Sequence, residues 1–276
     1  MQKQPTKIPF VHLHNHTEMS FLDGVCKIDD LVAKAKSDGM TALAITDHGN
    51  MHGALKFYNK CQKADIKPII GCEIYVTNDI YPADGSEPAE RSRDNYHLIL
   101  LAENNTGYHN LIKIVSEATE HFYYRPRATK EMLRKYNEGL IALTACLGGE
   151  LCCAIATGGY DAGKKIVDEY IDIFGRDNLY LEIQKHNIPD EARIYPVVIR
   201  IAKDMGMKVV ATNDIHYIDR TGAKAQEILF CVQSKKRLTD DDRMKSVTSE
   251  CYFKTAEEMF ALFKNGLHCM SNTAEI

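Results

Sequence analysis

The sequence contains no tryptophan, no Cys-x-x-Cys pair, no internal repeat and no run of 18 or more apolar residues. Without such a run we expect no transmembrane helix, and the opening MQKQPTKIPF lacks the apolar stretch of a secretory signal. The nine cysteines are odd in number and scattered, so they predict neither a disulfide framework nor a zinc ribbon. We therefore expect a protein of the reducing cytoplasm.

An excess of basic charge is also missing. Lys and Arg together number 34 and Asp and Glu 38, which gives a formal net charge of −4. This balance excludes a polybasic nucleic-acid binder, so any nucleic-acid contact must come from a local patch or from bound metal. No Gly-x-x-x-x-Gly-Lys motif occurs, which excludes a P-loop ATPase.

The order of apolar patterns predicts the fold. The 276 residues are 45% hydrophobic, and seven short apolar runs alternate with amphipathic helical patterns. This alternation favours a parallel sheet closed into an α/β barrel with its helices outside. The predicted strands are 11–13, 42–46, 68–76, 98–102, 140–144, 179–183 and 209–212, and the predicted helices are 28–36, 106–120, 129–136, 161–174 and 190–205. We interpret the polar stretch 78–95 and the charged stretch 233–251 as solvated loops.

Residues that bind metals follow most of the predicted strands. In a parallel barrel the strand ends meet at one rim, where active sites are built. Side chains two residues apart on a strand lie on the same face, so His14 and His16 can bind one ion together. His12 lies on that face too. Asp214 and His216 have the same spacing. A mixed set of imidazole and carboxylate ligands suits Zn, Mn or Fe, and two neighbouring ions would activate water and hold a phosphate.

Several motifs resemble a known superfamily. HNHT at 14–17 followed by Ser20 and by DG at 23–24, AITDHG at 44–49, GCE at 71–73 and ATNDIHY at 211–217 resemble the PHP (polymerase and histidinol phosphatase) superfamily. KPIIGCEIY at 67–75, YYRPR at 123–127 and EGLIALTAC at 138–146 resemble more closely the PHP domain of the bacterial DNA polymerase III alpha subunit. The resemblance covers nearly the whole chain.

The resemblance implies a distorted (βα)7 barrel with a centre of up to three divalent ions, Zn or Mn, with Fe or Mg as alternatives. The resemblance makes His97 a metal ligand, but this residue precedes its predicted strand. Either that strand begins earlier or the ligand lies elsewhere, for example at His109. His12 falls outside the pair of ligands and is expected to pack or to support them. The resemblance assigns His14, His16, Glu73 and Asp214 to one ion, Glu73, His97 and Cys146 to a second, and Asp23, His48 and His216 to a third.

The family also implies a function. It predicts one domain over residues 1–276, with 220–276 beginning the connection to a polymerase body, and hence an N-terminal fragment of a DNA-directed DNA polymerase, a nucleotidyltransferase of DNA replication. The fragment itself would lack the polymerase catalytic residues. It would act as a metal-dependent phosphoesterase, a 3′–5′ exonuclease for proofreading, whose metal-activated water needs no protein nucleophile. Pyrophosphate hydrolysis, a catalytically silent structural module and a free-standing small-molecule phosphatase remain alternatives.

The expected partners are a single-stranded DNA 3′ end, the rest of the polymerase III alpha chain and, through the full-length protein, other replisome subunits, with no membrane. Arg125 and Arg127 in the FYYRPR stretch at 122–127, together with His186, are candidates for contacting phosphate or DNA. The alternative for that stretch is a loop docked against the rest of a larger protein. Cys146 has the competing interpretation of a thiol nucleophile.

Overall fold

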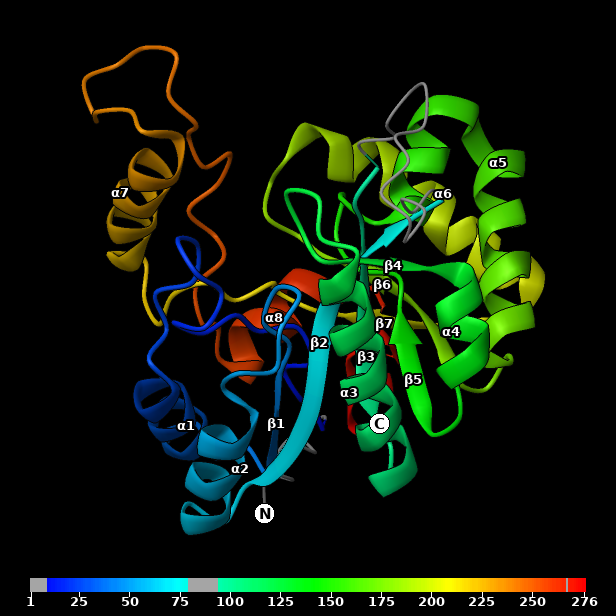
Figure 1. Cartoon of the computed structure of the whole chain (residues 1–276), viewed down its shortest axis with the longest axis horizontal. Helices are drawn as coiled ribbons and strands as arrows, with labels where there is room; N and C mark the ends of the chain where they lie inside the picture. Colours follow the sequence, from blue (N-terminus) through cyan, green and yellow to red (C-terminus); the bar gives the residue numbers. More distant parts are fainter. Residues whose placement is uncertain (1–8, 79–93, 267) are drawn as a thin grey trace, which may run out of the picture.

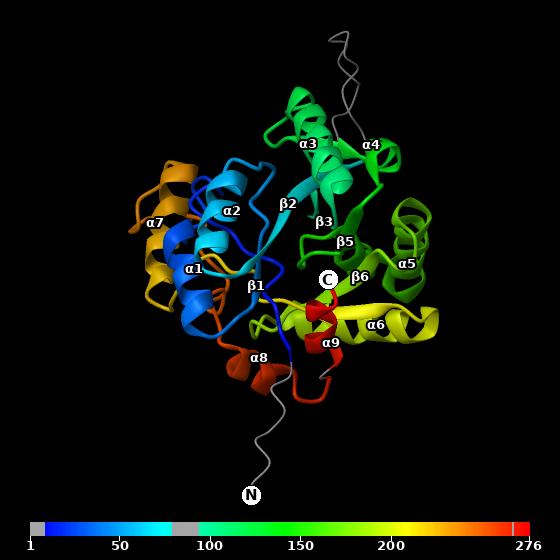
Figure 2. The same cartoon turned by 90° about the horizontal axis from the view of Figure 1, so that it is seen from below.

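The computed structural model describes residues 9–78, 94–266 and 268–276. A curled sheet of seven strands forms its centre, and helices lie around the outside (Figures 1 and 2). The strands are β1 (Ala42–Ile45), β2 (Lys67–Thr77), β3 (Tyr96–Ala102), β4 (Arg127–Thr129), β5 (Leu140–Leu143), β6 (Leu179–Ile183) and β7 (Lys208–Ala211). Their order is β1-β2-β3-β5-β6-β7, with β4 paired to β2.

One strand runs against the others. β3 is antiparallel to both β2 and β5, whereas the pairs β1–β2, β2–β4, β5–β6 and β6–β7 are parallel. The predicted α/β class is confirmed, and the sheet carries the distortion that the family resemblance implies. The expectation of an entirely parallel sheet is wrong for β3, because apolar periodicity carries no information on strand direction.

The segment at 10–16, which includes the first predicted strand, is extended but is not a regular strand. It forms no continuous ladder of hydrogen bonds with a neighbouring strand. On one side, the carbonyl of His12 accepts from the Ala44 amide at 3.1 Å. On the other side the His16 amide donates to the Ile215 carbonyl at 2.7 Å, and the Ile215 amide donates to the His14 carbonyl at 3.1 Å. This closing segment therefore links β1 to the chain that follows β7.

The two faces of the sheet bury different side chains. Alternate residues of a strand point to opposite faces, so Ile99 and Leu101 of β3 point into the curl while Leu98 and Leu100 pack against the outer helices. Glu73 of β2 is two residues beyond Gly71 and four beyond the inward Ile69, so it has the inward parity. The inner cluster comprises Val11, Leu13, Ala42, Ala44, Ile69, Ile99, Leu101, Ile141, Leu143, Ala145, Tyr180 and Val210.

Most predicted helices form with small shifts of their ends. The hydroxyl of Thr129 caps α4 by accepting from the Met132 amide. The helix expected over 161–174 begins earlier, at Glu150, because a kink at Gly159 (φ 71°) joins two helical pieces. The helices are α1 (Ile28–Ser37), α2 (Ala54–Lys63), α3 (Asn105–Glu120), α4 (Lys130–Tyr136), α5 (Glu150–Phe174), α6 (Pro189–Met205), α7 (Gly222–Ser234), α8 (Ala256–Phe263) and α9 (His268–Ser271).

The helices α2, α7 and α8 were not predicted. Residues 235–255, after α7, form no helix or regular strand, in agreement with the predicted loop there. The predicted loop at 78–95 lies almost wholly outside the described residues. In the described ranges, no helix combines the length and apolar character needed to cross a lipid bilayer.

The last residues pack beside the sheet. The amide of Val11 donates to the Thr273 hydroxyl at 2.9 Å, and the Asn272 side chain donates to the Val209 carbonyl at 2.7 Å. Ser271 ends α9, and Asn272 begins a short 3-10 turn. These contacts place the end of the chain beside the closing segment and β7.

Candidate metal centre

The strand ends converge on one group of imidazoles and carboxylates. His14 and His16 lie on the closing segment, Glu73 lies on β2, and Asp214 follows β7. The Nε2 atoms of the two histidines are 3.1 Å apart, and Oδ1 of Asp214 lies 3.1 Å from the first and 3.2 Å from the second. Oε2 of Glu73 lies 3.2 Å from His16 Nε2 and 3.7 Å from His14 Nε2. The four predicted ligands of the first ion are therefore brought together.

The reversed direction of β3 explains the position of His97. A residue near the start of an antiparallel strand lies at the rim where its parallel neighbours end. His97 Nδ1 is 2.7 Å from Oε1 of Glu73 and 3.5 Å from Sγ of Cys146. A Cβ at Gly148 would lie 3.2 Å from the same nitrogen, so glycine leaves room for the ring. The strand begins at Tyr96, one residue before the predicted ligand, and His109 is a surface residue of α3.

The third predicted set is joined to the first. His48 Nε2 lies 3.3 Å from Oδ2 of Asp23, and His216 Nε2 lies 3.4 Å from Oδ1 of the same carboxylate. The ring of His16 stacks on that of His48 at 4.0 Å and lies 4.4 Å from that of His216. The ligand atoms of His16, His48 and His216 all lie within 4.8 Å of one another, so His16 also belongs with the two histidines of the third set.

Glu73 connects the groups. Its Oε1 faces His97, while its Oε2 lies 2.7 Å from Nδ1 of His48 and 3.2 Å from Nε2 of His16. Among the described residues, neither Glu73 oxygen makes a hydrogen bond, although both are buried, and the same holds for Oδ1 of Asp214. Buried carboxylates are normally paired. Oxygens that face several imidazole nitrogens without a hydrogen bond have the arrangement of metal ligands, so these residues fit divalent ions.

Burial and neighbouring charges shift the pKa values of this group in opposite directions. Burial alone would raise the pKa of Glu73, but the imidazoles of His97, His48 and His14 hold it well below its usual value. Burial alone would lower the pKa of His48, but the carboxylates of Glu73 and Asp23 raise it to about 10. The pKa of His14 is likewise held well above its usual value, against burial, by Asp214, Glu182 and Glu73. The buried carboxylates thus favour the charged forms of His14 and His48.

The surroundings of Cys146 favour its uncharged form. Burial, reinforced by the charges of Asp214 and Glu73, raises its pKa well above the usual value. A cysteine nucleophile needs a lowered pKa. The surroundings therefore disfavour Cys146 as a nucleophile, whereas a bound cation would favour its thiolate.

A buried carboxylate that the ligand prediction did not include supports His14. Oε1 of Glu182 lies 2.7 Å from Nδ1 of His14. The same oxygen accepts from the Gln184 amide at 3.0 Å and from the Thr212 hydroxyl. An imidazole that donates from Nδ1 keeps the lone pair of Nε2 for a metal. Glu182 is an acidic residue in an otherwise apolar strand, which is the sequence signal for such a role.

Ser20 supports His16 in the same way. Its Oγ lies 3.1 Å from Nδ1 of His16 and donates to Oδ1 of Asp47 at 2.7 Å. Asp47 also accepts from the Thr17 amide at 2.6 Å. The hydroxyl proton of Ser20 is committed to Asp47, so His16 donates from Nδ1 and its Nε2 faces the other ligands. His12, by contrast, points away, with Nε2 2.8 Å from the Lys254 carbonyl.

Two of the predicted DNA contacts are not accessible. Arg127 is 1% exposed, and its guanidinium lies 5.0 Å from the ring of Tyr123. His186 is buried, with Nδ1 2.9 Å from Glu191 and Nε2 3.0 Å from the Asn213 carbonyl. Both ring nitrogens of His186 are thus occupied. This corrects the predicted contact of these two residues with phosphate or DNA, because both side chains are buried inside the protein.

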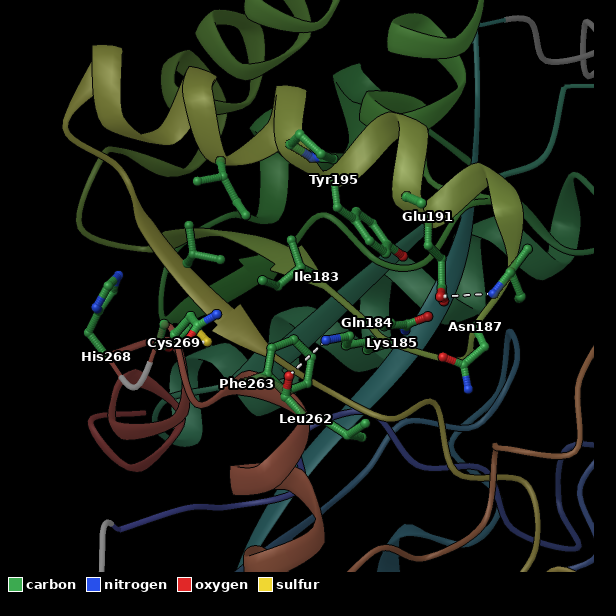
Figure 3. Close-up of a pocket in the computed structure, with 17 residues that line it drawn as sticks. Ile183, Gln184, Lys185, Asn187, Glu191, Tyr195, Leu262, Phe263, His268 and Cys269 are labelled. Carbon is green, nitrogen blue, oxygen red and sulfur yellow. Dashed lines mark hydrogen bonds between the residues drawn. The ribbon is translucent and has the colours of Figure 1, made fainter.

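A separate cavity lies beside α6. Its volume is about 510 Å³, and Figure 3 shows it between α6 and the side chains of Leu262, Phe263, His268 and Cys269. Most of its lining is apolar, and Lys185 reaches across to donate to the Leu262 carbonyl at 3.0 Å. None of the nine predicted metal ligands lines it.

Comparison with known proteins identifies the family of this chain. Residues 12–186 match the family model described as PHP domain. The DNA polymerase III subunit alpha of Helicobacter pylori is 43% identical over 278 residues, and that of Borreliella burgdorferi is 41% identical over 272; each alignment covers 97% of this chain. The chain spans less than a quarter of these relatives, 22% and 23% of their lengths.

A solved two-domain protein from Bacteroides vulgatus, described as containing a predicted PHP-like metal-dependent phosphoesterase, aligns with a TM-score of 0.49 and 13% identity. That alignment covers 99% of this chain and 68% of the other. The family model alone spans more than half of the 276 residues. The chain belongs to the PHP domain family.

Proposed function

We propose that this chain is the PHP domain of a replicative DNA polymerase III alpha subunit, and that the domain hydrolyses phosphodiester bonds as a 3′–5′ exonuclease on single-stranded DNA. Residues 1–276 would form one domain, with 220–276 leading toward the polymerase body. The rest of the alpha chain and DNA would be its partners. The identity and coverage of the polymerase relatives support the first part, and the ligand geometry supports the second.

The observation that carries the proposal is the position of Glu73. One oxygen faces His97 and the other faces His48 and His16, so one carboxylate touches each of the three predicted ligand sets. The nine ligands would hold up to three divalent ions, with Zn or Mn favoured by imidazole, carboxylate and thiolate donors. When bound, such ions supply Lewis acidity that activates water and neutralises phosphate charge.

Residues around the predicted ligands orient the histidine rings and offer a contact for phosphate. Glu182 and Ser20 fix the rings of His14 and His16, so that each Nε2 faces the other ligands. Arg125 remains as the predicted phosphate contact, because its guanidinium lies beside the ligand group, 5.4 Å from the ring of Tyr75. No protein nucleophile is required in this arrangement.

The test is hydrolysis of a 5′-labelled single-stranded oligonucleotide by the chain loaded with Mn²⁺ or Zn²⁺. We expect a ladder that shortens from the 3′ end, and we expect no cleavage of circular single-stranded DNA, which has no end. His16→Ala and Asp214→Ala should reduce cleavage to background while the far-UV CD spectrum stays folded. His109→Ala, a histidine on the surface of α3, is the matched control and should cleave normally.

Two outcomes would overturn the proposal. Full cleavage by His16→Ala would show that the ligand assignment is wrong. If the folded, metal-loaded chain cleaved neither DNA nor a simple phosphodiester, the centre would be a metal-stabilised structural module of the polymerase.

A further inference from the structure

Two aromatic side chains stand exposed beside the metal centre. Phe122 is 63% exposed and Tyr124 is 72% exposed, in a turn closed by a hydrogen bond from the Tyr123 amide to the Arg125 carbonyl at 3.0 Å. Tyr124 adopts φ 59°, in the left-handed region that residues other than glycine seldom occupy. The backbone is therefore held in a strained conformation that presents a large ring to solvent, and such strain clusters at functional sites.

The turn is anchored to the candidate ligands. The guanidinium of Arg125 lies 5.4 Å from the ring of Tyr75, and that ring lies 5.3 Å from His97 and 6.0 Å from His48. Pro126 packs against the residue after His48, since a Cβ added at Gly49 would lie 2.6 Å from its ring. The segment that carries the exposed rings is thus packed, through Arg125 and Pro126, against residues next to the candidate ligands.

The charge of the turn is unbalanced. Within the ranges that the structure describes, Arg125 forms no ion pair with a carboxylate, and its recorded contact is the face of Tyr75. Arginine suits phosphate because its planar guanidinium donates to two oxygens at once. An unpaired guanidinium beside a metal centre and two exposed rings combines the contacts that a nucleotide needs, a phosphate partner and a stacking surface.

We infer that Phe122 and Tyr124 form a stacking platform for unpaired bases, and that Arg125 holds the phosphate between those bases and the metal centre. The ligand is single-stranded nucleic acid, since bases in a duplex cannot present their faces to a projecting ring. The inference deepens the proposed function and rests on it for the reaction, although binding can be measured without hydrolysis.

The test measures binding of a fluorescein-labelled single-stranded oligonucleotide by anisotropy, at low salt and with a chelator present so that no cleavage occurs. Tyr124→Ala and Phe122→Ala should each weaken binding by about fivefold or more, up to roughly 150-fold, from the loss of one stacked base. Tyr124→Phe keeps the ring and should bind like the parent chain. Tyr58→Ala removes a tyrosine that is 46% exposed on α2, away from the turn, and should change nothing.

A leucine variant separates stacking from a general apolar contact. Tyr124→Leu keeps apolar area but has no aromatic face, so it should bind as weakly as Tyr124→Ala. Arg125→Ala should reduce the slope of log affinity against log salt by about 0.7, the effect of one lost phosphate contact on a single strand. Parent-like binding by both Tyr124→Leu and Tyr124→Ala would overturn the inference and indicate that this surface docks against protein.

Hydrolysis of methyl 4-nitrophenyl phosphate, which has no base, separates this inference from the proposed function. We expect Tyr124→Ala to cleave the small diester at the parent rate and to lose kcat/KM on the oligonucleotide by the factor lost in binding. If the parent chain cleaved neither substrate, the proposed function would fail, while the anisotropy series would still decide whether the platform binds DNA.

Discussion

Oε1 of Glu73 lies 2.7 Å from Nδ1 of His97, and the two residues come from adjacent strands that run in opposite directions. Glu73 is in the second half of β2, and His97 is the second residue of β3. Antiparallel pairing places the beginning of one strand beside the end of the other. The reversal of β3 therefore places His97 on the rim of the candidate metal centre, together with the predicted ligands that parallel strands bring there.

Replacing His97 tests this relationship. His97→Ala removes a nitrogen that faces both Glu73 and Cys146, so we expect the purified chain to lose about one metal ion per molecule. His109→Ala should keep the metal content of the parent, because that ring is exposed and bonded to the Asn105 carbonyl of its own helix. Elemental analysis after exhaustive dialysis gives the count. An unchanged count for His97→Ala would place the ligand elsewhere.

A second prediction concerns Glu182. Glu182→Gln keeps the size of the side chain and an acceptor oxygen, but removes the charge that orients His14 and increases its basicity. Zinc affinity, measured by competition with a chromophoric chelator, should fall by about 10- to 100-fold with the far-UV CD spectrum preserved.

The matched control for Glu182→Gln is Glu191→Gln. Glu191 is also buried and paired to a histidine, but its partner His186 is not a predicted ligand. We expect this variant to lower the melting temperature and to leave zinc affinity within about twofold of the parent. Equal losses of affinity in the two variants would mean that Glu182 acts through general stability alone.

Metal removal should make stability depend on pH in a particular direction. In the metal-free fold the pKa of His48 is about 10, above its ordinary value of 6.5, because Glu73 and Asp23 outweigh the effect of burial. A group whose pKa rises on folding stabilises the fold below its unfolded pKa, and this contribution is lost as pH rises toward the folded pKa. The chelated chain should therefore melt at a lower temperature at pH 8.5 than at pH 6.5.

Added zinc should reverse this trend, because metal binding requires neutral imidazoles and displaces their protons. The gain in melting temperature on adding zinc should be larger at pH 8.5 than at pH 6.5, with each kcal/mol of stability giving about 2–4 °C. Differential scanning calorimetry with chelator and with zinc measures both slopes. A chelated chain that became more stable toward pH 8.5 would contradict the charge arrangement described here.

Much of the centre is readable from the sequence because its residues occupy strand ends. Apolar runs locate the strands, and the residues that follow them, such as His48 and Asp214, have the chemistry of metal ligands. The cap at Thr129 is also local, since it needs only a hydroxyl one residue before a helix. Local patterns of this kind require no knowledge of distant contacts.

Tertiary structure alone decided three features. These are the direction of β3, the orientation of His12 away from the other histidines, and the burial of Arg127. Strand direction depends on which neighbours pair, and the rule that alternate residues share a face holds only in a regular strand, which the closing segment is not. Burial of Arg127 and the pairing of Glu182 with His14 depend on segments far apart in the chain. The sequence by itself indicated candidate ligands, most of them placed after predicted strands. The tertiary structure decided which of them meet, because strand pairing and packing bring together residues whose separation in the sequence carries no sign of their contact.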